Sequence, residues 1–202
     1  MSNIFITGVS SGVGRELAKK YVASGHKVWG IARRRPELQV LSEELGKNNF
    51  FYSVCDVSNQ DEIENTKFEM DNNNFKPDII ILNAGINPEA NKNSFTLDEI
   101  EGVIQTNYLG ALRWIKIFIP FFLERKKGQF AAISSLNAYR GDSRWIGYSA
   151  SKSALSRSFE SLRGRYADKG IVFTTIHLGA VDTGMGANSS SPFKISPSKA
   201  AS

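Results

Sequence analysis

The sequence has little of what metal centres and disulfide frameworks need. Cys55 is its only cysteine, and His26 and His177 are its only histidines. One cysteine cannot form a disulfide within the chain, which fits a protein of a reducing compartment. Without clustered cysteine and histidine ligands we expect no metal site, and we interpret both histidines as strand residues.

Long apolar segments are also missing. The first apolar run, residues 4–6, is short and is followed almost at once by Gly8, so it does not have the form of a secretory signal. The longest apolar stretch, residues 114–123, is interrupted by Lys116 and Pro120 and is too short to cross a bilayer. We therefore expect a cytoplasmic protein without a membrane partner.

The distribution of charge argues against a nucleic-acid partner. The formal net charge is +5, and basic residues form runs only at 33–35 and 125–127. Neither run is interleaved with aromatic side chains, whereas a mild positive balance suits anionic small molecules. The 202 residues, of which 41% are hydrophobic, show no repeats and no interdomain linker, so we predict one domain over residues 1–202.

Short apolar runs alternate with segments of helical spacing along the chain. This alternation predicts a doubly wound parallel α/β sheet of the Rossmann type, in three αβα layers. Pro120 should bend the longest helix locally. The predicted strands are residues 3–6, 26–32, 50–54, 77–82, 129–133 and 171–178, and the predicted helices are residues 15–23, 36–46, 58–70, 96–125 and 148–167.

A glycine-rich turn joins the first predicted strand to the first predicted helix. Glycines let the backbone approach a pyrophosphate closely, and a helix N-terminus offers N–H groups and the positive end of a dipole. An ordinary turn is the alternative, but the flanking strand and helix favour a phosphate cradle. The turn reads Thr7-Gly8-Val9-Ser10-Ser11-Gly12-Val13-Gly14.

The end of the second predicted strand indicates which nucleotide would bind. A free ribose 2′-hydroxyl requires an acidic residue there. Here Ala32 occupies that position and is followed by Arg33, Arg34 and Arg35. A cationic fork suits a 2′-phosphate, with Arg33 as the predicted contact. The alternative is a solvated basic loop before Pro36.

Tyr148 and Lys152 lie one helical turn apart. A nearby ammonium group would lower the tyrosine pKa from its usual value of about 10, so the pair could exchange a proton with a substrate oxygen. The spacing is common by chance, and an exposed helix pair is the alternative. Ser149 and Lys152 also fit the Ser-x-x-Lys motif of penicillin-binding enzymes, but the Ser-Asp-Asn and Lys-Thr-Gly motifs do not occur.

Taken in order, these motifs resemble the short-chain dehydrogenase/reductase family over nearly the whole chain. The glycine turn has the spacing of the ordinary, non-extended branch, and Ser135 precedes Tyr148 by the family's interval. Asn83-Ala84-Gly85 matches the Asn-Ala-Gly that follows the fourth strand in this family. The resemblance implies the strand order 3-2-1-4-5-6 and a nicotinamide cofactor, which the arginine run makes NADP(H) in preference to NAD(H).

The resemblance also implies a catalytic tetrad. Tyr148 would transfer the proton, and Lys152 would lower the tyrosine pKa and bind the nicotinamide ribose. Ser135 would hydrogen-bond the carbonyl oxygen, and Asn107 would hold a relay water. The implied activity is hydride transfer between NADP(H) and a small carbonyl or alcohol substrate. The alternative is a non-catalytic NADP-binding sensor or scaffold protein, which would need no Tyr148.

Further cofactor contacts follow from the same resemblance. Asp56 would lie beside the adenine with Val57 next to it, and the segment after the sixth strand would contact the nicotinamide, although Leu178 stands where the family has proline. The full predicted set is Gly8, Ser10, Ser11, Gly12, Val13, Gly14, Arg33, Asp56, Val57, Asn83, Ala84, Gly85, Tyr148, Lys152, Gly179, Val181 and Thr183.

The family's seventh strand and last helix have no counterpart in the sequence, which reaches Ser202 where that helix would begin. We expect a substrate loop over about residues 180–202, with residues 184–202 poorly ordered without cofactor. The helix within 107–125 is apolar nearly all round, which predicts a second subunit as its cover. We expect a homodimer that does not form tetramers, with Trp114, Phe118 and Phe121 as candidate contacts.

Overall fold

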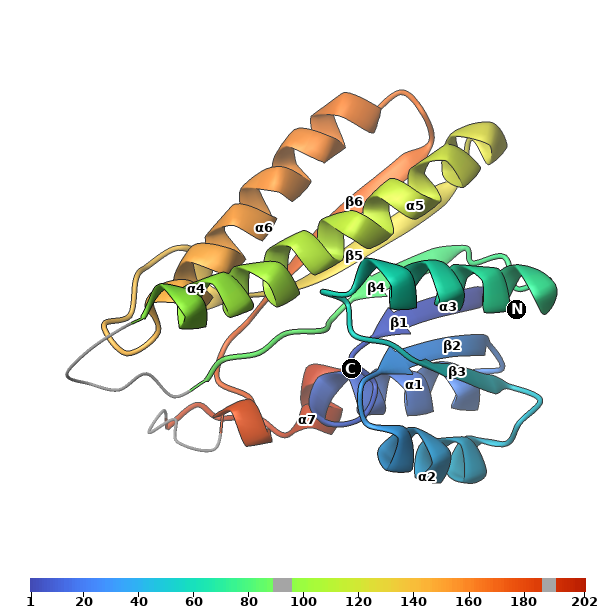
Figure 1. The fold of residues 1–202 in the computed structure, drawn as a ribbon, viewed down its shortest axis with the longest axis horizontal. Helices are drawn as coiled ribbons and strands as arrows, with labels where there is room; N and C mark the ends of the chain where they lie inside the picture. Colours follow the sequence, from blue (N-terminus) through green and yellow to red (C-terminus); the bar gives the residue numbers. More distant parts are fainter. Residues whose placement is uncertain (89–95, 187–191) are drawn as a thin grey trace. The chain divides into compact units, whose positions relative to one another are not determined.

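Six strands in the order β3-β2-β1-β4-β5-β6 form the sheet of the computed structural model, which describes residues 1–88, 96–186 and 192–202 (Figure 1). This is the predicted doubly wound order. The strands are β1 (Asn3–Thr7), β2 (Lys27–Ala32), β3 (Phe50–Val54), β4 (Ile79–Leu82), β5 (Gly128–Ser135) and β6 (Ile171–Leu178).

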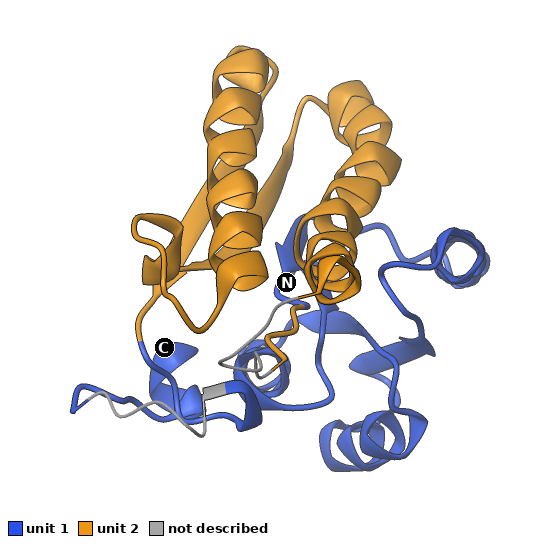
Figure 2. Ribbon diagram, turned by 60° about the vertical axis from the view of Figure 1, so that its left-hand side comes forward, with its two compact units in different colours: residues 1–84, 180–202 blue, residues 85–179 orange. Residues whose placement is uncertain are grey.

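Helices follow the strands in alternation. The chain divides into two compact units, residues 1–84 with 180–202 and residues 85–179 (Figure 2). The first unit holds α1 (Gly12–Ala23), α2 (Arg35–Leu45), α3 (Gln60–Asn72) and α7 (Pro197–Ala200), and the second holds α4 (Leu97–Ile104), α5 (Gly110–Arg125) and α6 (Ile146–Tyr166).

Parallel pairing organises the first unit. β1 pairs with β2 from Asn3↔Lys27 onward and with β4 from Ile4↔Ile79 onward. Ile4, Phe5 and Ile6 are fully buried, as expected of a central strand covered on both faces. α1 and α2 lie on one face of these strands and α3 lies on the other (Figure 1).

An aromatic cluster forms the core of the second unit. β5 and β6 pair in parallel along their whole length, from Gly128↔Ile171 to Ser135↔Leu178. Phe130 of β5 lies 5.0 Å from Phe173 of β6 and 5.1 Å from Phe122 of α5, measured between ring centroids. Phe159 of α6 joins the cluster at 5.5 Å from Phe173. These buried rings hold α5 and α6 against the strand pair.

The long helix predicted for residues 96–125 is built in three parts. Thr96 caps α4 through a capping box with Glu99. A π-helical turn, residues 105–109, then separates α4 from α5, and α5 runs on through Pro120. The departure from α geometry therefore lies at the π turn, and this turn carries Asn107.

Trp114 and Phe118 are buried within the chain, with exposures of 0% and 1%. Their rings stack at 5.9 Å, and Phe118 stacks on Phe122 at 6.5 Å. Two of the three predicted subunit contacts are therefore wrong, because the chain itself covers these side chains. Phe121 is only half-buried and lies beneath the Arg125 guanidinium. The homodimer itself stays a prediction.

This burial predicts the effect of shortening Phe118. Phe118→Ala should lower the free energy of unfolding by about 3–5 kcal/mol, because it leaves a cavity in the core. Phe68 of α3 is 66% exposed, so Phe68→Ala provides a matched control with a much smaller effect. Urea titration measures both variants. A dissociating Phe118→Ala protein with unchanged unfolding would instead place Phe118 at a subunit contact.

Candidate active site

Tyr148 and Lys152 lie on the first turns of α6. The Lys152 Nζ atom is 5.7 Å from the centroid of the Tyr148 ring. Lys152 is 4% exposed, and its Nζ donates a 2.7 Å hydrogen bond to the Ile133 carbonyl of β5. The helical spacing and the adjacent strand thus place a buried ammonium group beside the phenol.

Burial dominates the protonation of both side chains. It raises the pKa of Tyr148, against the opposing effect of a hydrogen bond with Ser135. It lowers the pKa of Lys152 to about 8. Desolvation of the phenolate outweighs the hydrogen bond with Ser135, and the expectation that Lys152 lowers the tyrosine pKa stays a prediction. The phenol is therefore protonated at neutral pH, as a proton donor must be.

The lowered pKa of Lys152 predicts how stability depends on pH. Because the folded state binds this proton more weakly, the unfolded state holds more protons between pH 8 and 10.5, so stability rises with pH in that window. Between pH 8 and 10.5 the free energy of unfolding of the wild-type protein should rise by up to about 3 kcal/mol relative to that of Lys152→Met. Urea titrations near pH 7 and pH 10 measure this difference, and a difference independent of pH would contradict the buried amine.

Asn107 lies in the π turn and is 1% exposed. Its side chain accepts from the Ile86 N–H at 2.7 Å and donates to the Ile86 carbonyl at 2.9 Å. A Cβ atom at Gly85 would lie 3.3 Å from Asn107 Oδ1 and 3.6 Å from Lys152 Nζ. Gly85, Asn107 and Lys152, all predicted from the sequence, therefore lie together in the second unit.

Ser151 is a residue that the sequence analysis missed. It is fully buried, donates a 2.7 Å bond to the Tyr148 carbonyl and accepts a 3.1 Å bond from Asn107 Nδ2. Ser151 thereby connects the π turn to the first turn of α6. Its position between Tyr148 and Lys152 is the only sequence feature that could have identified it. Helical spacing alone does not distinguish it from a surface serine.

Serine hydroxyls at the end of β5 and within α6 form hydrogen bonds around the Lys152 backbone. Ser135 ends β5, and its Oγ accepts from the Asn137 N–H at 3.2 Å. The preceding Ser134 is hydrogen-bonded to Ser156 at 2.8 Å, and Ser156 donates to the Lys152 carbonyl at 2.8 Å. His177 of β6 lies 3.2 Å from Ser156 Oγ, so this strand residue belongs to the support of α6.

The glycine turn of the first unit is held by Asn83. Its Nδ2 donates to the carbonyls of Thr7 and Gly8 at 3.0 and 3.1 Å, and Thr7 Oγ1 accepts from the N–H groups of Asn83 and Ala84. A Cβ atom at Gly14 would lie 2.3 Å from the Gly8 carbonyl oxygen, so only glycine fits there. The turn and the start of α1 form the compact cradle that a pyrophosphate needs.

Two arginines stand at the end of β2. Arg34 Nη2 donates to the hydroxyls of Ser10 and Ser11 at 2.9 and 2.8 Å, whereas Arg33 Nη1 lies 3.5 Å from Asp56 Oδ2. Burial alone would raise the pKa of Asp56, but bonds from Ser58 and the charge of Arg33 outweigh it, and the pKa is lowered. The sequence predicts Arg33 as the phosphate contact, and Arg34 lies at the glycine turn, bound to Ser10 and Ser11.

The remaining predicted cofactor residues fall in both units. Val13 lies in the first turn of α1, and Val57 is buried just after β3. Thr183 lies against Gly12, where a Cβ atom would be 3.1 Å from its methyl carbon. Val181, in the same unit, forms a bridge with Ile195. Gly179 belongs to the second unit.

Part of the predicted substrate loop forms regular secondary structure. Residues 192–202 carry the Ile195 bridge and α7, whose N-cap Ser196 accepts from the Lys199 N–H, and α7 packs against α1. The poor order expected of residues 184–202 without cofactor stays a prediction. Residues 187–191 lie outside the described residues.

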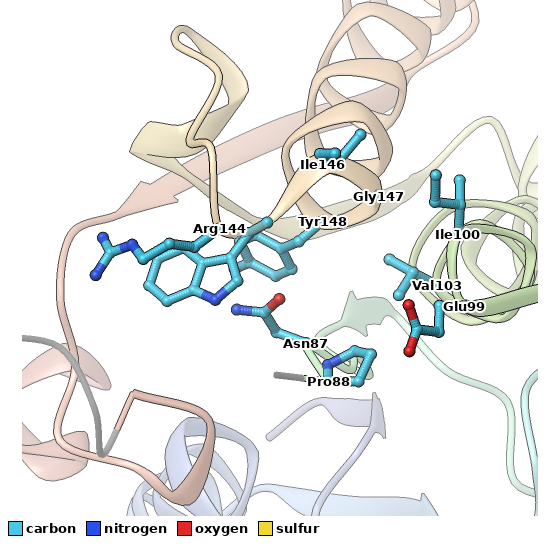
Figure 3. A pocket seen from close by; sticks show the side chains of 10 residues that line it. Asn87, Pro88, Glu99, Ile100, Val103, Arg144, Ile146, Gly147 and Tyr148 are labelled. Atoms are coloured by element: carbon cyan, nitrogen blue, oxygen red, sulfur yellow. The ribbon is translucent and has the colours of Figure 1, made fainter. Parts of the chain in front are cut away.

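A pocket opens beside Tyr148 within the second unit (Figure 3). Its cavity volume is about 40 Å³, and it is open to solvent on one side. Among the described residues, no three His, Cys, Asp or Glu side chains could hold a metal ion, and no described helix is long and apolar enough to cross a membrane. The pocket is lined by Asn87, Pro88, Glu99, Ile100, Val103, Arg144, Trp145, Ile146, Gly147 and Tyr148.

Comparison with known families assigns the class of protein. The family model described as short chain dehydrogenase matches residues 2–193, so the chain belongs to the short-chain dehydrogenase/reductase family. It is accordingly an oxidoreductase with an NAD(P)-binding fold.

Individual relatives are similar over most of the chain. An uncharacterized oxidoreductase of Myxococcus xanthus is 32% identical over 93% of this chain and 75% of its own. The 3-oxoacyl-[acyl-carrier-protein] reductase of Buchnera aphidicola (subsp. Acyrthosiphon pisum) is 31% identical, over 89% of this chain and 73% of its own. The NADPH-dependent pterin aldehyde reductase of Arabidopsis thaliana is 31% identical, over 89% and 75%. The chain thus spans about three quarters of these relatives.

Solved structures share the fold at lower identity. A serine dehydrogenase complexed with NADP+ has a TM-score of 0.90 at 23% identity, over 98% of this chain and 86% of its own. The 3-ketoacyl-(acyl-carrier-protein) reductase of Brucella melitensis complexed with NADH has a TM-score of 0.91 at 22% identity, over 99% and 87%. These likenesses establish the fold alone.

Proposed function

We propose that the protein reduces a carbonyl group of a small molecule with NADPH, using Ser135, Tyr148, Lys152 and Asn107. The observation that carries this proposal is the arrangement around Tyr148, whose side chain is hydrogen-bonded with Ser135 and whose ring centroid lies 5.7 Å from Lys152 Nζ. A protonated phenol next to a cation suits proton donation to an oxygen on which negative charge develops.

When bound, NADPH supplies a hydride for the carbonyl carbon. Tyr148 donates its phenolic proton to the carbonyl oxygen, which completes the alcohol. The Ser135 hydroxyl hydrogen-bonds that oxygen as it gains charge, and the Lys152 ammonium stabilises the phenolate that remains. Asn107, fixed by Ile86 and Ser151, holds the chain beside Lys152 in place.

Two arginines support the choice of NADP(H) over NAD(H). Arg33 and Arg34 directly follow β2, where an acidic residue would bind a free ribose 2′-hydroxyl. The glycine turn is narrow enough to suit a pyrophosphate. Relatives and neighbours give mixed support, since the pterin aldehyde reductase is NADPH-dependent and one structural neighbour holds NADP+, whereas another holds NADH.

The absorbance of NADPH at about 340 nm tests the activity with a panel of aldehydes, ketones and quinones. Consumption that requires both the carbonyl compound and the Tyr148 hydroxyl is the expected result. Tight NADPH binding without consumption by any member would favour the alternative, a non-catalytic NADP-binding sensor or scaffold protein.

We further propose a cytoplasmic homodimer. Half-buried apolar side chains of α5, among them Leu112, Ile119 and Phe121, leave part of this helix for a second copy to cover. The buried Cys55 suits a reducing compartment. Sedimentation of a monomer at micromolar concentration would overturn the dimer.

A further inference from the structure

The pocket beside Tyr148 has an apolar wall built by two helices. Ile100 and Val103 come from α4, and Ile146 begins α6. The helices approach closely at Gly147, where a Cβ atom would lie 3.2 Å from Ile100 Cα. Figure 3 shows these side chains around the space in front of Tyr148. Such a wall favours an apolar group attached to the reacting carbonyl.

Trp145 gives this wall a flat aromatic surface. Its ring lies edge-to-face with Tyr148 at 6.5 Å, and the Arg144 guanidinium lies 4.5 Å from its centroid. Asp142 binds Arg144 through two bonds of 3.0 and 2.9 Å. This ion pair orients the guanidinium over the indole and offsets the charge of the arginine, so Arg144 offers little attraction to an anion.

Glu99 is the acidic residue of the pocket. It lies in the first turn of α4, and its carboxylate is directed toward the space beside Val103 and Pro88 (Figure 3). The same side chain accepts from the Thr96 N–H as part of the capping box. The capping box thus holds one negative charge at the pocket that Trp145 also lines.

We infer that this pocket selects an uncharged or cationic carbonyl compound with a planar apolar ring and disfavours a carboxylated one. Trp145 would stack on the ring, and Glu99 would repel a carboxylate and attract a cationic substituent. This inference rests on the proposed carbonyl reduction. Like charges that share a partly solvated pocket differ from a neutral pair by roughly 5- to 10-fold in affinity.

Three ring substrates test the charge preference. They are benzaldehyde, 4-carboxybenzaldehyde and 4-(trimethylammonio)benzaldehyde, assayed for kcat/KM with NADPH. Substituents also alter the reactivity of the carbonyl. The readout is therefore the ratio of kcat/KM for the cationic substrate to kcat/KM for the anionic one, compared between variants. Glu99→Gln should lower this ratio about 5- to 10-fold, mainly through KM.

Glu99→Gln preserves the helix cap, because glutamine also serves in a capping box. Glu101→Gln is the matched control, since it removes the same charge from the same exposed helix and Glu101 does not line the pocket. It should change the ratio by less than about twofold. Equal changes in both variants would overturn the role of Glu99.

Replacing Trp145 tests the ring preference. Trp145→Ala should lower kcat/KM for benzaldehyde about 10-fold, because ring contact and apolar burial are lost, and should change that for acetaldehyde much less. Trp145→Phe, which keeps a flat ring, should restore most of the benzaldehyde activity. A uniform loss for both aldehydes would show that Trp145 only stabilises the loop.

Binding to the Tyr148→Phe variant separates this inference from the proposed function. Calorimetry with NADPH present measures the affinities of the three ring compounds without chemistry. Charge-dependent binding without turnover in the wild-type protein would support the pocket and overturn the reductase. Turnover whose ratio of kcat/KM values is unchanged in Glu99→Gln would support the reductase and overturn the inference. Absence of binding by all three compounds would also overturn the inference.

Discussion

Replacing Tyr148 with phenylalanine should lower kcat by about 10²–10⁴-fold, the usual contribution of general acid catalysis. The substitution removes only the hydroxyl. The ring keeps its place near Trp145 and Lys152, so the variant should fold and bind NADPH. Steady-state rates of NADPH oxidation with the best carbonyl substrate measure the loss, and fluorescence titration with NADPH measures cofactor binding.

Tyr166→Phe is the matched control for this experiment. Tyr166 lies at the end of the same helix and stacks on Phe173 at 5.8 Å, so the control also loses a phenolic hydroxyl from α6. Its turnover should equal that of the wild-type protein. Near-normal turnover of Tyr148→Phe would mean that another group donates the proton, and the proposed tetrad would be wrong.

Removing Arg33 and Arg34 should weaken NADPH binding far more than NADH binding. A charge-assisted bond contributes about 1.5–3 kcal/mol, so each arginine that holds the 2′-phosphate should account for roughly 10- to 150-fold in the Michaelis constant for NADPH. NADH lacks that phosphate and is the internal control. The structure adds that Arg34→Ala should have an effect of its own, because Arg34 is bound to the hydroxyls of Ser10 and Ser11.

Arg35→Ala is the control within the same run, because Arg35 begins α2 and is exposed. It should leave the ratio of the two Michaelis constants nearly unchanged. The preference for NADPH should also weaken with added salt, since the arginine side chains are exposed and screening is effective there. Equal losses for both cofactors, or a wild-type preference for NADH, would contradict the assignment.

The positions of the strands were predictable because each strand is an apolar run between turn residues, whereas their order was implied by the family resemblance. Residues 79–82 and 4–6 are buried nearly completely, and their short length and β-branched content favour strand over helix. The π turn at 105–109 was not predictable in the same way. It forms where Asn107 bonds the backbone of Ile86, a contact distant in sequence that no local propensity encodes.

Spacing located Tyr148 and Lys152, but their protonation depends on burial. The pKa of Tyr148 is raised because the fold desolvates it, and sequence spacing contains no measure of that. Phe118 illustrates the same limit, since an apolar helix does not reveal whether its own chain or a second copy covers each side. The run of three arginines likewise does not indicate whether Arg33 or Arg34 lies nearer the glycine turn.

Transfer of deuterium from labelled NADPH tests the proposed reaction most directly. With deuterium at the transferable C4 position of the reduced nicotinamide, the alcohol product is analysed by mass spectrometry. Carbonyl reduction through Tyr148 predicts a deuterium on the carbinol carbon of the alcohol for each NADPH oxidised, and a strongly diminished yield with Tyr148→Phe. Alcohol that contains no deuterium, or labelled product formed equally fast without the Tyr148 hydroxyl, would contradict it.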